Sequence, residues 1–465
     1  MDALAALFQR QRAARWEVAA STPPQRRAKL GRLLGALMDR RAEAHAALAA
    51  DFRKAPAEVD LAELWPLAAE IRFAIRGLGR WLRPARAPAP LAFAGSRSWV
   101  RFEPKGVVLV ISPWNYPLYL TLGPLVSAIA AGNCVVVKPS EYTPGASAFL
   151  KSLLGGLFPE AEVAVAEGGQ EVAEALLGLP FDHIFFTGSP AVGRQVMRAA
   201  AEHLGSVTLE LGGKSPVLVD ADADPRAAAR RIAWGKFLNA GQTCVAPDHV
   251  LAHDRIHDAL VEELERSVAS FYGATPAQRR ASPDFARIVN ARHHARLRGL
   301  LRDSPGRVRL GGDWDEADNY FAPTLVTDVP LDAPLMREEI FGPILPVLRV
   351  PDLEAAVRLV NDRPKPLALY VFTARRERAE ALLARTTSGG SCINDTVLHF
   401  VQPGLPGGGV NASGIGKAHG FHGFQAFSNA RGVLASPRRY SPIQWMYPPY
   451  TPRVRKIIDF ALRYL

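Results

Sequence analysis

The chain has 465 residues, 48% of them hydrophobic, which allows two or three domains with well-filled cores. The net charge of +11 is spread along the chain without a Lys/Arg run longer than three, so no nucleic-acid partner is expected. No apolar run reaches about 18 residues and no signal-peptide block opens the chain, so we expect no transmembrane anchor. Three cysteines provide no disulfide framework and indicate a reducing, cytoplasmic location.

The N-terminal part of the chain is predicted to be helical. Apolar residues recur at helical spacing over residues 26–48 and again over residues 61–82, until a proline-rich segment at 84–90 breaks the pattern. The β-prone piece that follows, Ser98–Glu103, lies between turn residues. It looks like an excursion away from the main body.

From residue 106 apolar strands alternate with helices, which predicts a parallel sheet covered on both faces. The elements of this first stretch are expected at 107–111, 123–131, 134–137, 144–158, 163–166, 171–177 and 183–186. After Glu210 the alternation begins again and predicts a second α/β domain. Its strands are expected at 216–219, 249–253, 324–327, 345–350 and 367–372, and its helices at 225–238, 255–271, 353–361 and 376–385. The tail is glycine-rich, β-prone near 427–434, and ends in a helix at 454–465.

Two short stretches carry candidate chemistry. Cys244 lies in the polar loop Asn239–Asp248, between a helix and a strand, where a thiolate nucleophile would be accessible. A single cysteine is more often a buried core residue. Glu210, however, stands in an otherwise apolar strand that ends in two glycines, and a carboxylate is costly to bury there unless it has a function.

A dinucleotide-binding fingerprint of the G-x-G-x-x-G type is absent after the first strand. The nearest phosphate site is the turn with Gly188, Ser189 and Pro190, where an N-capped helix could meet a pyrophosphate. An ordinary capped helix is the alternative. Lys138 and Glu141 follow a neighbouring strand and could hold a ribose, or form a strand-end salt bridge.

Asn115, between aromatic residues and prolines, has an amide that could stabilise an oxyanion, although a turn-forming asparagine is the alternative. No His/Cys cluster has the spacing of metal ligands, so no metal is expected. His293 and His294 are interpreted as a solvated helix face, and Cys134 as a core residue of a strand. Cys392, near Asn394, is left open.

The stretches Thr208–Pro216 and Asn239–Asp248, in this order, resemble the aldehyde dehydrogenase superfamily, as does Glu339–Pro343, which matches its E-x-F-G-P motif. The resemblance implies Cys244 as nucleophile, Glu210 as general base, and Asn115 with the Cys244 N–H as oxyanion hole. It also implies an α/β fold of that family, with a Rossmann-like parallel-sheet cofactor domain, a second α/β catalytic domain and a small β oligomerisation arm. We expect the NAD(P)-binding domain at 1–83 and 106–210, the catalytic domain at 211–396, the arm at 84–105 and 397–440, and a C-terminal tail at 441–465.

The same resemblance implies further site residues. The ribose, the phosphate turn and the nicotinamide would be held by a set of cofactor-binding residues: Trp114, Lys138, Ser140, Glu141, Gly188, Ser189, Val192, Gly193, Leu211, Glu339 and Phe341. The substrate tunnel would include Tyr116, Thr243, His399 and Phe400. The cofactor is expected to be NAD, because Glu141 would favour a free ribose hydroxyl, with NADP also accepted.

Four segments resemble the class 3 branch, which includes fatty and coniferyl aldehyde dehydrogenases: Ala50–Lys54, Trp114–Leu118, Lys365–Tyr370, and Asn394–Thr396 followed by His399 and Phe400. The expected substrate is therefore an aromatic aldehyde of the coniferyl type or a medium- or long-chain aliphatic aldehyde. Two departures concern the substrate: Gly407 replaces the phenylalanine of an L-P-F-G-G motif, removing an aromatic ring from the tunnel mouth, and Asn411 replaces a glycine.

Two alternatives stay open. A CoA-acylating semialdehyde dehydrogenase would pass the thioester to a thiol, but such enzymes lack the base that Glu210 provides. A family member recruited as a binding or structural protein would be expected to have lost Cys244 or Glu210. The exposed apolar ribbon Trp99–Phe102 would be an aggregation hazard unless paired, so a two-stranded arm and a two-fold homodimer are predicted.

Overall fold

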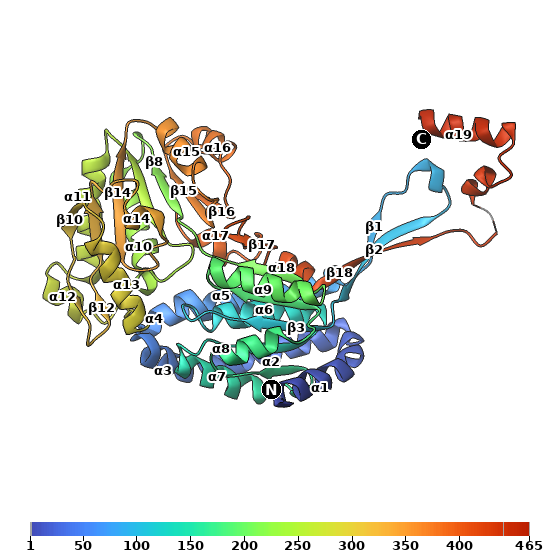
Figure 1. Cartoon of the computed structure of the whole chain (residues 1–465), viewed down its shortest axis with the longest axis horizontal. Helices are drawn as coiled ribbons and strands as arrows, with labels where there is room; N and C mark the ends of the chain where they lie inside the picture. Colours follow the sequence, from blue (N-terminus) through green and yellow to red (C-terminus); the bar gives the residue numbers. More distant parts are fainter. Residues whose placement is uncertain (1, 440, 465) are drawn as a thin grey trace.

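The computed structural model describes residues 2–439 and 441–464. Figure 1 shows a body built on two sheets, from which a narrow arm projects. The last helix, α19 (Pro452–Tyr464), lies at the far end of this arm. A short π-helical turn, η1 (Asp60–Leu64), leads directly into α5 (Trp65–Trp81).

The first sheet has six strands in the order β17-β7-β6-β3-β4-β5, and all neighbours are parallel except β17 and β7. Its strands are short runs rich in Val, Ile and Phe that are buried on both faces, as in other covered parallel sheets. Their bounds are β3 (Val107–Ile111), β4 (Cys134–Lys138), β5 (Val163–Val165), β6 (His183–Thr187), β7 (Ser206–Glu210) and β17 (Gly414–Ile415). The predicted parallel sheet is confirmed, with strand ends within about one residue.

Helices cover both faces of this sheet and enclose two separate apolar clusters. The region 26–48, predicted to be helical, contains two helices, because the helical conformation is interrupted at Arg40. The helices of this part are α1 (Asp2–Ala19), α2 (Pro23–Asp39), α3 (Arg41–Phe52), α4 (Pro56–Val59), α5 (Trp65–Trp81), α6 (Tyr119–Ala131), α7 (Pro144–Gly155), α8 (Gln170–Leu177) and α9 (Pro190–Glu202).

The second sheet has seven strands in the order β10-β13-β14-β9-β8-β15-β16, parallel except between β10 and β13. Its strands are β8 (Pro216–Val219), β9 (His249–His253), β10 (Arg307–Leu310), β13 (Thr324–Thr327), β14 (Ile344–Val350), β15 (Ala368–Phe372) and β16 (Gly390–Ile393), beside a hairpin of β11 (Trp314–Asp315) and β12 (Tyr320–Phe321). The helices are α10 (Pro225–Phe237), η3 (Leu238–Gly241), α11 (His257–Tyr272), α12 (Pro276–Ala281), α13 (Ala291–Arg302), α14 (Pro334–Arg337), α15 (Leu353–Asn361) and α16 (Arg376–Leu383).

The arm is a three-stranded antiparallel sheet, not the two-stranded ribbon that the sequence predicts. β2 (Arg97–Pro104) pairs along its full length with β18 (Ser428–Ala435), and β1 (Ala85–Ala87) adds a short third strand. β1 gives no sequence signal because it has three residues and lies among prolines. The remaining short elements are η2 (Leu91–Phe93), α17 (Leu398–Val401), α18 (Gly420–Ala426) and η4 (Pro442–Met446).

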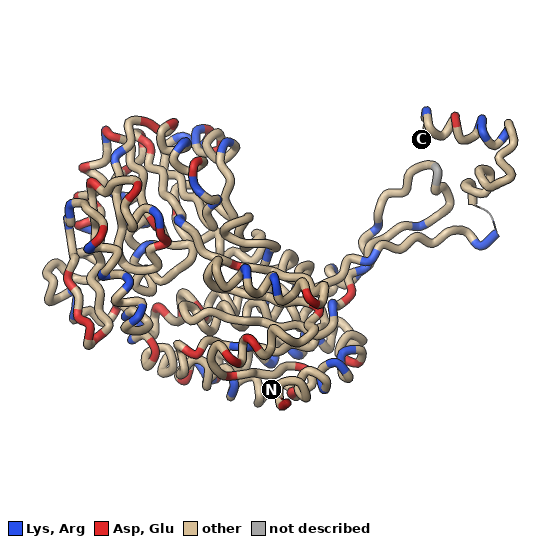
Figure 2. The backbone as a smooth tube through the Cα atoms, viewed as in Figure 1, with Lys and Arg blue, Asp and Glu red and all other residues tan. Residues whose placement is uncertain are grey.

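Charges of both signs are interspersed over the body (Figure 2). Within the described residues, no helix is both long and apolar enough to cross a membrane.

Candidate active site

The carboxyl ends of four parallel strands bring most of the predicted site residues to one edge of the first sheet. Asn115 follows β3, Lys138 ends β4, Gly188 follows β6 and Glu210 ends β7. Ligands bind at this edge of open α/β sheets because loops diverge there. The second sheet contributes the Cys244 loop, which lies between η3 and β9.

Cys244 lies where two cavities meet. One, the apolar cavity, has an empty volume of about 630 Å³ and includes Tyr116, Thr243 and Phe400 in its wall. The other, the strand-end cavity, has about 750 Å³ and includes Asn115 and Glu210. Of the described residues that line these two cavities, Cys244 alone lines both.

Burial, together with the smaller effect of the nearby carboxylates of Glu339 and Glu210, raises the pKa of the Cys244 thiol to about 12. The thiol is therefore protonated at neutral pH in the free protein. A nucleophile at this position needs a base, or positive charge brought by a ligand, before it attacks. The carboxylates of Glu210 and Glu339 are close enough to be candidates for that base.

Glu210 is buried and has no hydrogen-bond partner for either carboxylate oxygen among the described residues. Burial raises the pKa of Glu210, and the smaller opposing effects of His419 and Lys417 leave it at about 7. Glu210 also lines a smaller cavity of about 360 Å³ that we call the Glu210 cavity, together with His419, whose Nε2 is equally buried and without a described partner. Unpaired buried polar atoms around a cavity of this size are the usual setting for ordered water. A base with a pKa near 7 and water beside it suits general-base chemistry.

Asn115 is buried, and its Nδ2 donates a hydrogen bond to the backbone oxygen of Gln242 at 3.0 Å. An amide nitrogen carries two hydrogens, so one remains for an acceptor in the strand-end cavity. Gln242 is two residues before Cys244 in the chain. The amide donor and the thiol are therefore tied to the same loop.

The strand-end cavity fits one end of a dinucleotide. Ser189 caps α9 by accepting from the Val192 N–H at 3.4 Å, with Pro190 as the first helical residue. The backbone can approach a phosphate closely at Gly188, where a side chain would not fit, because a Cβ there would lie 2.6 Å from the Phe186 ring. Helix N-termini of this kind bind phosphate through free N–H groups and the helix dipole.

The far wall of the same cavity is built by an aromatic pair and a carboxylate. The rings of Trp114 and Phe341 lie edge to face with centroids 5.3 Å apart. Burial raises the pKa of Glu339 to about 7, and its carboxylate packs against the Gly212 backbone, where a Cβ would lie 2.0 Å from Oε2. Leu211 also lines the cavity and fills the space over Gly193. A flat ring and a ribose would find apolar and acceptor contacts here.

Four other predicted cofactor residues, Lys138, Ser140, Glu141 and Val192, do not line this cavity. Lys138 is buried at the end of β4, and its Nζ pairs with Glu141 at 2.8 Å. The Glu141 side chain is 39% exposed and free to change partners. Ser140 accepts from the Tyr142 N–H, and Val192 is exposed on the first turn of α9.

In the apolar cavity, the hydroxyls of Tyr116 and Thr243 share a hydrogen bond of 2.7 Å, so each hydroxyl already has one partner. His399 does not lie in this wall. Its Nδ1 contacts the Cys392 sulfur at 3.3 Å, and its ring packs against Tyr370. Most of the wall comes from residues that sequence reasoning missed, since apolar positions on helices are indistinguishable from core positions: Leu61, Ala62, Trp65, Tyr119, Leu120, Trp234, Leu238, Val245, Val397, Leu398 and Val401.

The interpretation of His293 and His294 as a solvated helix face is wrong. His294 is fully buried and its Nε2 contacts the backbone oxygen of Tyr320 at 3.0 Å. His293 lines the strand-end cavity and packs on Trp114, and Arg296, one turn later on α13, donates to the backbone oxygens of Glu339 and Ile340. The i, i+3 spacing of His293 and Arg296, which places both side chains on one face of a helix, is the sequence signal that could have pointed to a shared site.

The two other cysteines lie outside these cavities. Cys134 is fully buried in β4, which confirms the core interpretation. Cys392 is in β16 beside His399. Within the described residues, no group of three His, Cys, Asp or Glu side chains could hold a metal ion.

The two sequence departures have structural counterparts. A Cβ at Gly407 would lie 2.0 Å from His419 Cδ2, so the glycine leaves room for the imidazole that lines the Glu210 cavity. Gly407 does not line the apolar cavity, so its position does not support the expected effect on the tunnel mouth. Asn411 has φ 55° and accepts a hydrogen bond from Lys365 at 2.8 Å.

Comparison with known proteins gives consistent matches. The profile of the "Aldehyde dehydrogenase family" matches residues 2–433. The chain is 45% identical over 438 residues to the "Aldehyde dehydrogenase family 3 member B1" of Rattus norvegicus, covering 94% of this chain and 92% of that protein. It is 44% identical to the "Probable coniferyl aldehyde dehydrogenase" of Pseudomonas aeruginosa, covering 98% and 96%. The solved "Substrate bound state of Staphylococcus Aureus AldH" superposes with a TM-score of 0.93 at 39% identity, covering 98% of each chain.

Proposed function

Since this chain belongs to the aldehyde dehydrogenase family, and is an oxidoreductase that converts an aldehyde to the carboxylic acid with NAD(P), we propose that Cys244 is its nucleophile. The observation that carries this proposal is the position of Cys244 between the apolar cavity and the strand-end cavity. An aldehyde in the first cavity and a dinucleotide in the second would both reach the same sulfur.

The reaction begins with the Cys244 proton. The raised pKa of this thiol means that a carboxylate, Glu210 or Glu339, has to accept the proton as the site fills. The sulfur then bonds to the aldehyde carbon, and the carbonyl electron pair moves onto the oxygen. Asn115 Nδ2 and the Cys244 N–H hold that oxyanion. The bound nicotinamide supplies the chemistry of a hydride acceptor, and the carbon that has lost its hydride remains on Cys244 as a thioester.

Glu210 then activates water for hydrolysis. Its carboxylate takes a proton from a water molecule of the Glu210 cavity as the oxygen attacks the thioester carbon. The C–S bond breaks, the electron pair returns to Cys244, and the carboxylic acid leaves. A CoA-acylating enzyme would have no use for this carboxylate, so hydrolysis is the reading that Glu210 supports.

The cofactor is proposed to be NAD, with NADP used less well. Lys138 and Glu141 would hold the adenosine ribose, where a carboxylate favours a free 2′-hydroxyl over a 2′-phosphate. Because Glu141 is partly exposed and, among the described residues, is bonded to Lys138 only, it can turn away and admit the phosphate. Ser189 and the N-terminus of α9 would hold the pyrophosphate, and Glu339, Phe341 and Trp114 the nicotinamide end.

The substrate is proposed to be an aromatic or a medium- to long-chain aliphatic aldehyde. The apolar cavity is lined almost entirely by hydrophobic side chains, and its two hydroxyls are paired with each other. A charged or strongly polar aldehyde would find no partner for its polar groups there. The coniferyl name of one relative agrees with the aromatic option.

Domain organisation, assembly and location complete the proposal. Residues 1–83 and 106–210 form the cofactor domain and residues 211–396 the catalytic domain, and the half-exposed arm pairs with a second copy in a homodimer. The three cysteines are free thiols, which fits the cytoplasm.

Absorbance of reduced nicotinamide tests this function. Benzaldehyde and decanal are each supplied with NAD, with and without CoA. We expect reduction without CoA and no stimulation by it. Strict dependence on CoA would favour the acyl-transfer reaction.

A further inference from the structure

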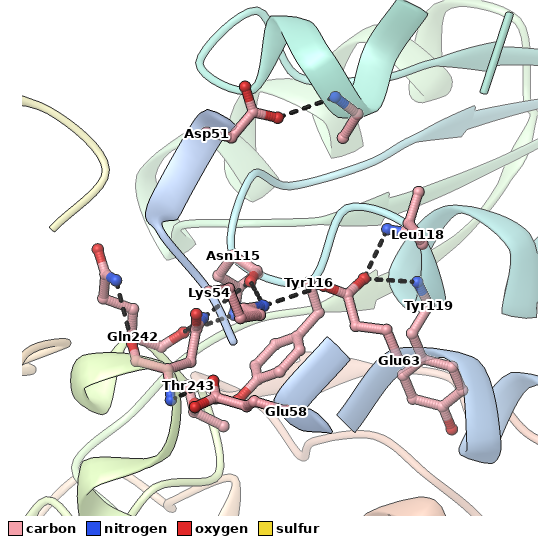
Figure 3. Close-up of polar contacts among 12 residues, drawn as sticks. Asp51, Lys54, Glu58, Glu63, Asn115, Tyr116, Leu118, Tyr119, Gln242 and Thr243 are labelled. Atoms are coloured by element: carbon pink, nitrogen blue, oxygen red, sulfur yellow. Dashed lines mark hydrogen bonds and ion pairs between the residues drawn. The ribbon is translucent and has the colours of Figure 1, made fainter. Parts of the chain in front are cut away.

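A buried ionic cluster lies behind the wall of the apolar cavity. The side chains of Lys54 and Glu63 have no exposed surface, and Lys54 Nζ is 3.0 Å from Glu63 Oε1. Both come from the N-terminal helical layer, near α3 and α5 (Figure 3). The desolvation cost of burying such a pair roughly offsets the attraction between its charges, so stability alone gives little reason for its presence.

The cluster holds the segment that contains Asn115. Glu63 Oε2 accepts from the backbone N–H groups of Leu118 and Tyr119, at 2.8 and 3.2 Å, and so caps the start of α6 with a carboxylate. Lys54 Nζ lies 3.5 Å from the Asn115 backbone oxygen and 4.6 Å from the centre of the Tyr116 ring. The segment of residues 115–119 is thus held at the Asn115 carbonyl, at the Tyr116 ring and at the backbone N–H groups of Leu118 and Tyr119.

A second carboxylate, Glu58, holds the turn before Cys244. Asn239, Ala240 and Gly241 all have positive φ (53°, 51° and 74°), a left-handed conformation that asparagine and glycine tolerate but that is unfavourable for Ala240. Glu58 Oε1 accepts from the Asn239 N–H at 2.9 Å. Such a turn persists only where its surroundings hold it.

The two held segments are bonded to each other. Asn239 Nδ2 donates to the Asn115 backbone oxygen at 2.8 Å and to the Gln242 oxygen at 3.2 Å. Asn115 Nδ2 donates to the same Gln242 oxygen. Tyr116 and Thr243 close the contact through their hydroxyls. The position of the Asn115 amide relative to Cys244 therefore depends on a network that ends on Lys54, Glu63 and Glu58 (Figure 3).

We propose that Lys54, Glu63 and Glu58 are positioning residues that hold the Asn115 amide and the Cys244 loop in register for attack on the aldehyde. They touch neither cavity and act through Asn115 and Asn239. An error of about 1 Å in such a placement costs about 10²-fold in rate. The inference rests on the proposed role of Asn115.

The main test is a double-mutant cycle on the full chain with hexanal and NAD. Lys54→Met/Glu63→Gln removes both charges and keeps an acceptor for the Leu118 N–H, so the fold is retained and the thermal midpoint stays within about 3 °C. The rate of the first turnover of reduced cofactor should fall about 10–100-fold, while the NAD dissociation constant changes less than about threefold. Lys29→Met/Glu162→Gln, a matched change at another largely buried ion pair, should leave the rate within about threefold.

The cycle is completed in the Asn115→Ala background. Asn115→Ala alone should lower the first-turnover rate about 10²–10³-fold. Adding Lys54→Met/Glu63→Gln should then cost less than about threefold more, because residues that act through one group are not additive. Fully additive losses would show a general effect on the fold and overturn the inference. A full rate in Lys54→Met/Glu63→Gln, with Asn115→Ala inactive, would overturn it while leaving the proposed function intact. An Asn115→Ala variant with a full first-turnover rate would overturn the inference together with the proposed role of Asn115, and would leave Cys244 as the proposed nucleophile.

Glu58 gives a second test that does not depend on the buried pair. Glu58→Gln keeps an oxygen for the Asn239 N–H and should retain the first-turnover rate within about threefold. Glu58→Ala removes that acceptor and should lower the rate about tenfold, with NAD affinity unchanged. Equal rates in both variants and the parent would remove Glu58 from the network.

Discussion

Replacing Glu210 by glutamine separates the two halves of the proposed reaction. The substitution keeps size and shape, and it breaks no hydrogen bond within the described chain, since neither carboxylate oxygen has a partner there. It also removes a buried acid, so stability should not fall. Any loss of rate then reports on chemistry and not on the fold.

The size of the expected rate loss follows from the role of general base assigned to Glu210. A positioned base contributes about 10²–10⁴-fold, or about 2.7–5.4 kcal/mol of barrier. This loss should appear in the steady state. Thioester formation should survive, because Cys244 and Asn115 are unchanged and Glu339 can still accept a proton. Removing the Glu210 charge should also ease ionisation of Cys244, whose pKa that charge raises.

Stopped-flow absorbance of reduced nicotinamide provides the assay. One rapid turnover per active site, followed by a slow steady rate, is expected for Glu210→Gln. Hydroxylamine, which attacks thioesters without a base, should restore part of the steady rate. A variant with undiminished steady turnover would refute the assignment of Glu210 as the hydrolytic base. A variant without the first turnover would show that Glu210, not Glu339, is the base for Cys244.

Three further predictions concern pH, cofactor and assembly. The turnover number of the parent should rise with pH through a midpoint near 7, because the ionised form of Glu210 is the active base and its pKa is about 7, and pH–rate profiles should show this limb missing in Glu210→Gln. Glu141→Gln should shift the ratio of kcat/KM for NAD and NADP toward NADP, and a parent that strictly prefers NADP would contradict the placement of Glu141 at the ribose. Light scattering should find a dimer at micromolar concentration and a monomer after Trp99→Glu in the arm, whereas a monomeric parent would contradict pairing through this ribbon.

Regular, densely apolar elements were predictable from the sequence. β3, β8, β9 and β13 lie where their apolar runs place them, since such runs can be satisfied only in a covered sheet. α13 was missed because its polar, arginine-rich sequence has few apolar positions. Pairing partners and exact strand number in the arm depend on distant segments, so β1 was missed as well.

Site residues that belong to sequence motifs were predictable, and residues that reach the site only through tertiary packing were not. Asn115 and Glu210 line one cavity because the parallel strands β3 and β7 end at one edge of the first sheet, and the Cys244 loop of the second sheet meets them there. His293, in contrast, looks like a surface residue until α13 is placed over Trp114. Lys54 and Glu63 also look solvent-exposed in sequence, since charged residues on helices usually are. Only their burial behind Tyr116 reveals a different environment.

Peptide mass spectrometry of the Glu210→Gln variant, quenched during turnover of hexanal with NAD, tests the central claim most directly. The acyl group is predicted on the peptide that contains Cys244, in close to one copy per chain, and absent from those that contain Cys134 and Cys392. An unmodified Cys244 after a complete first turnover of reduced cofactor, or an acyl group on either of the other cysteines, would contradict the account.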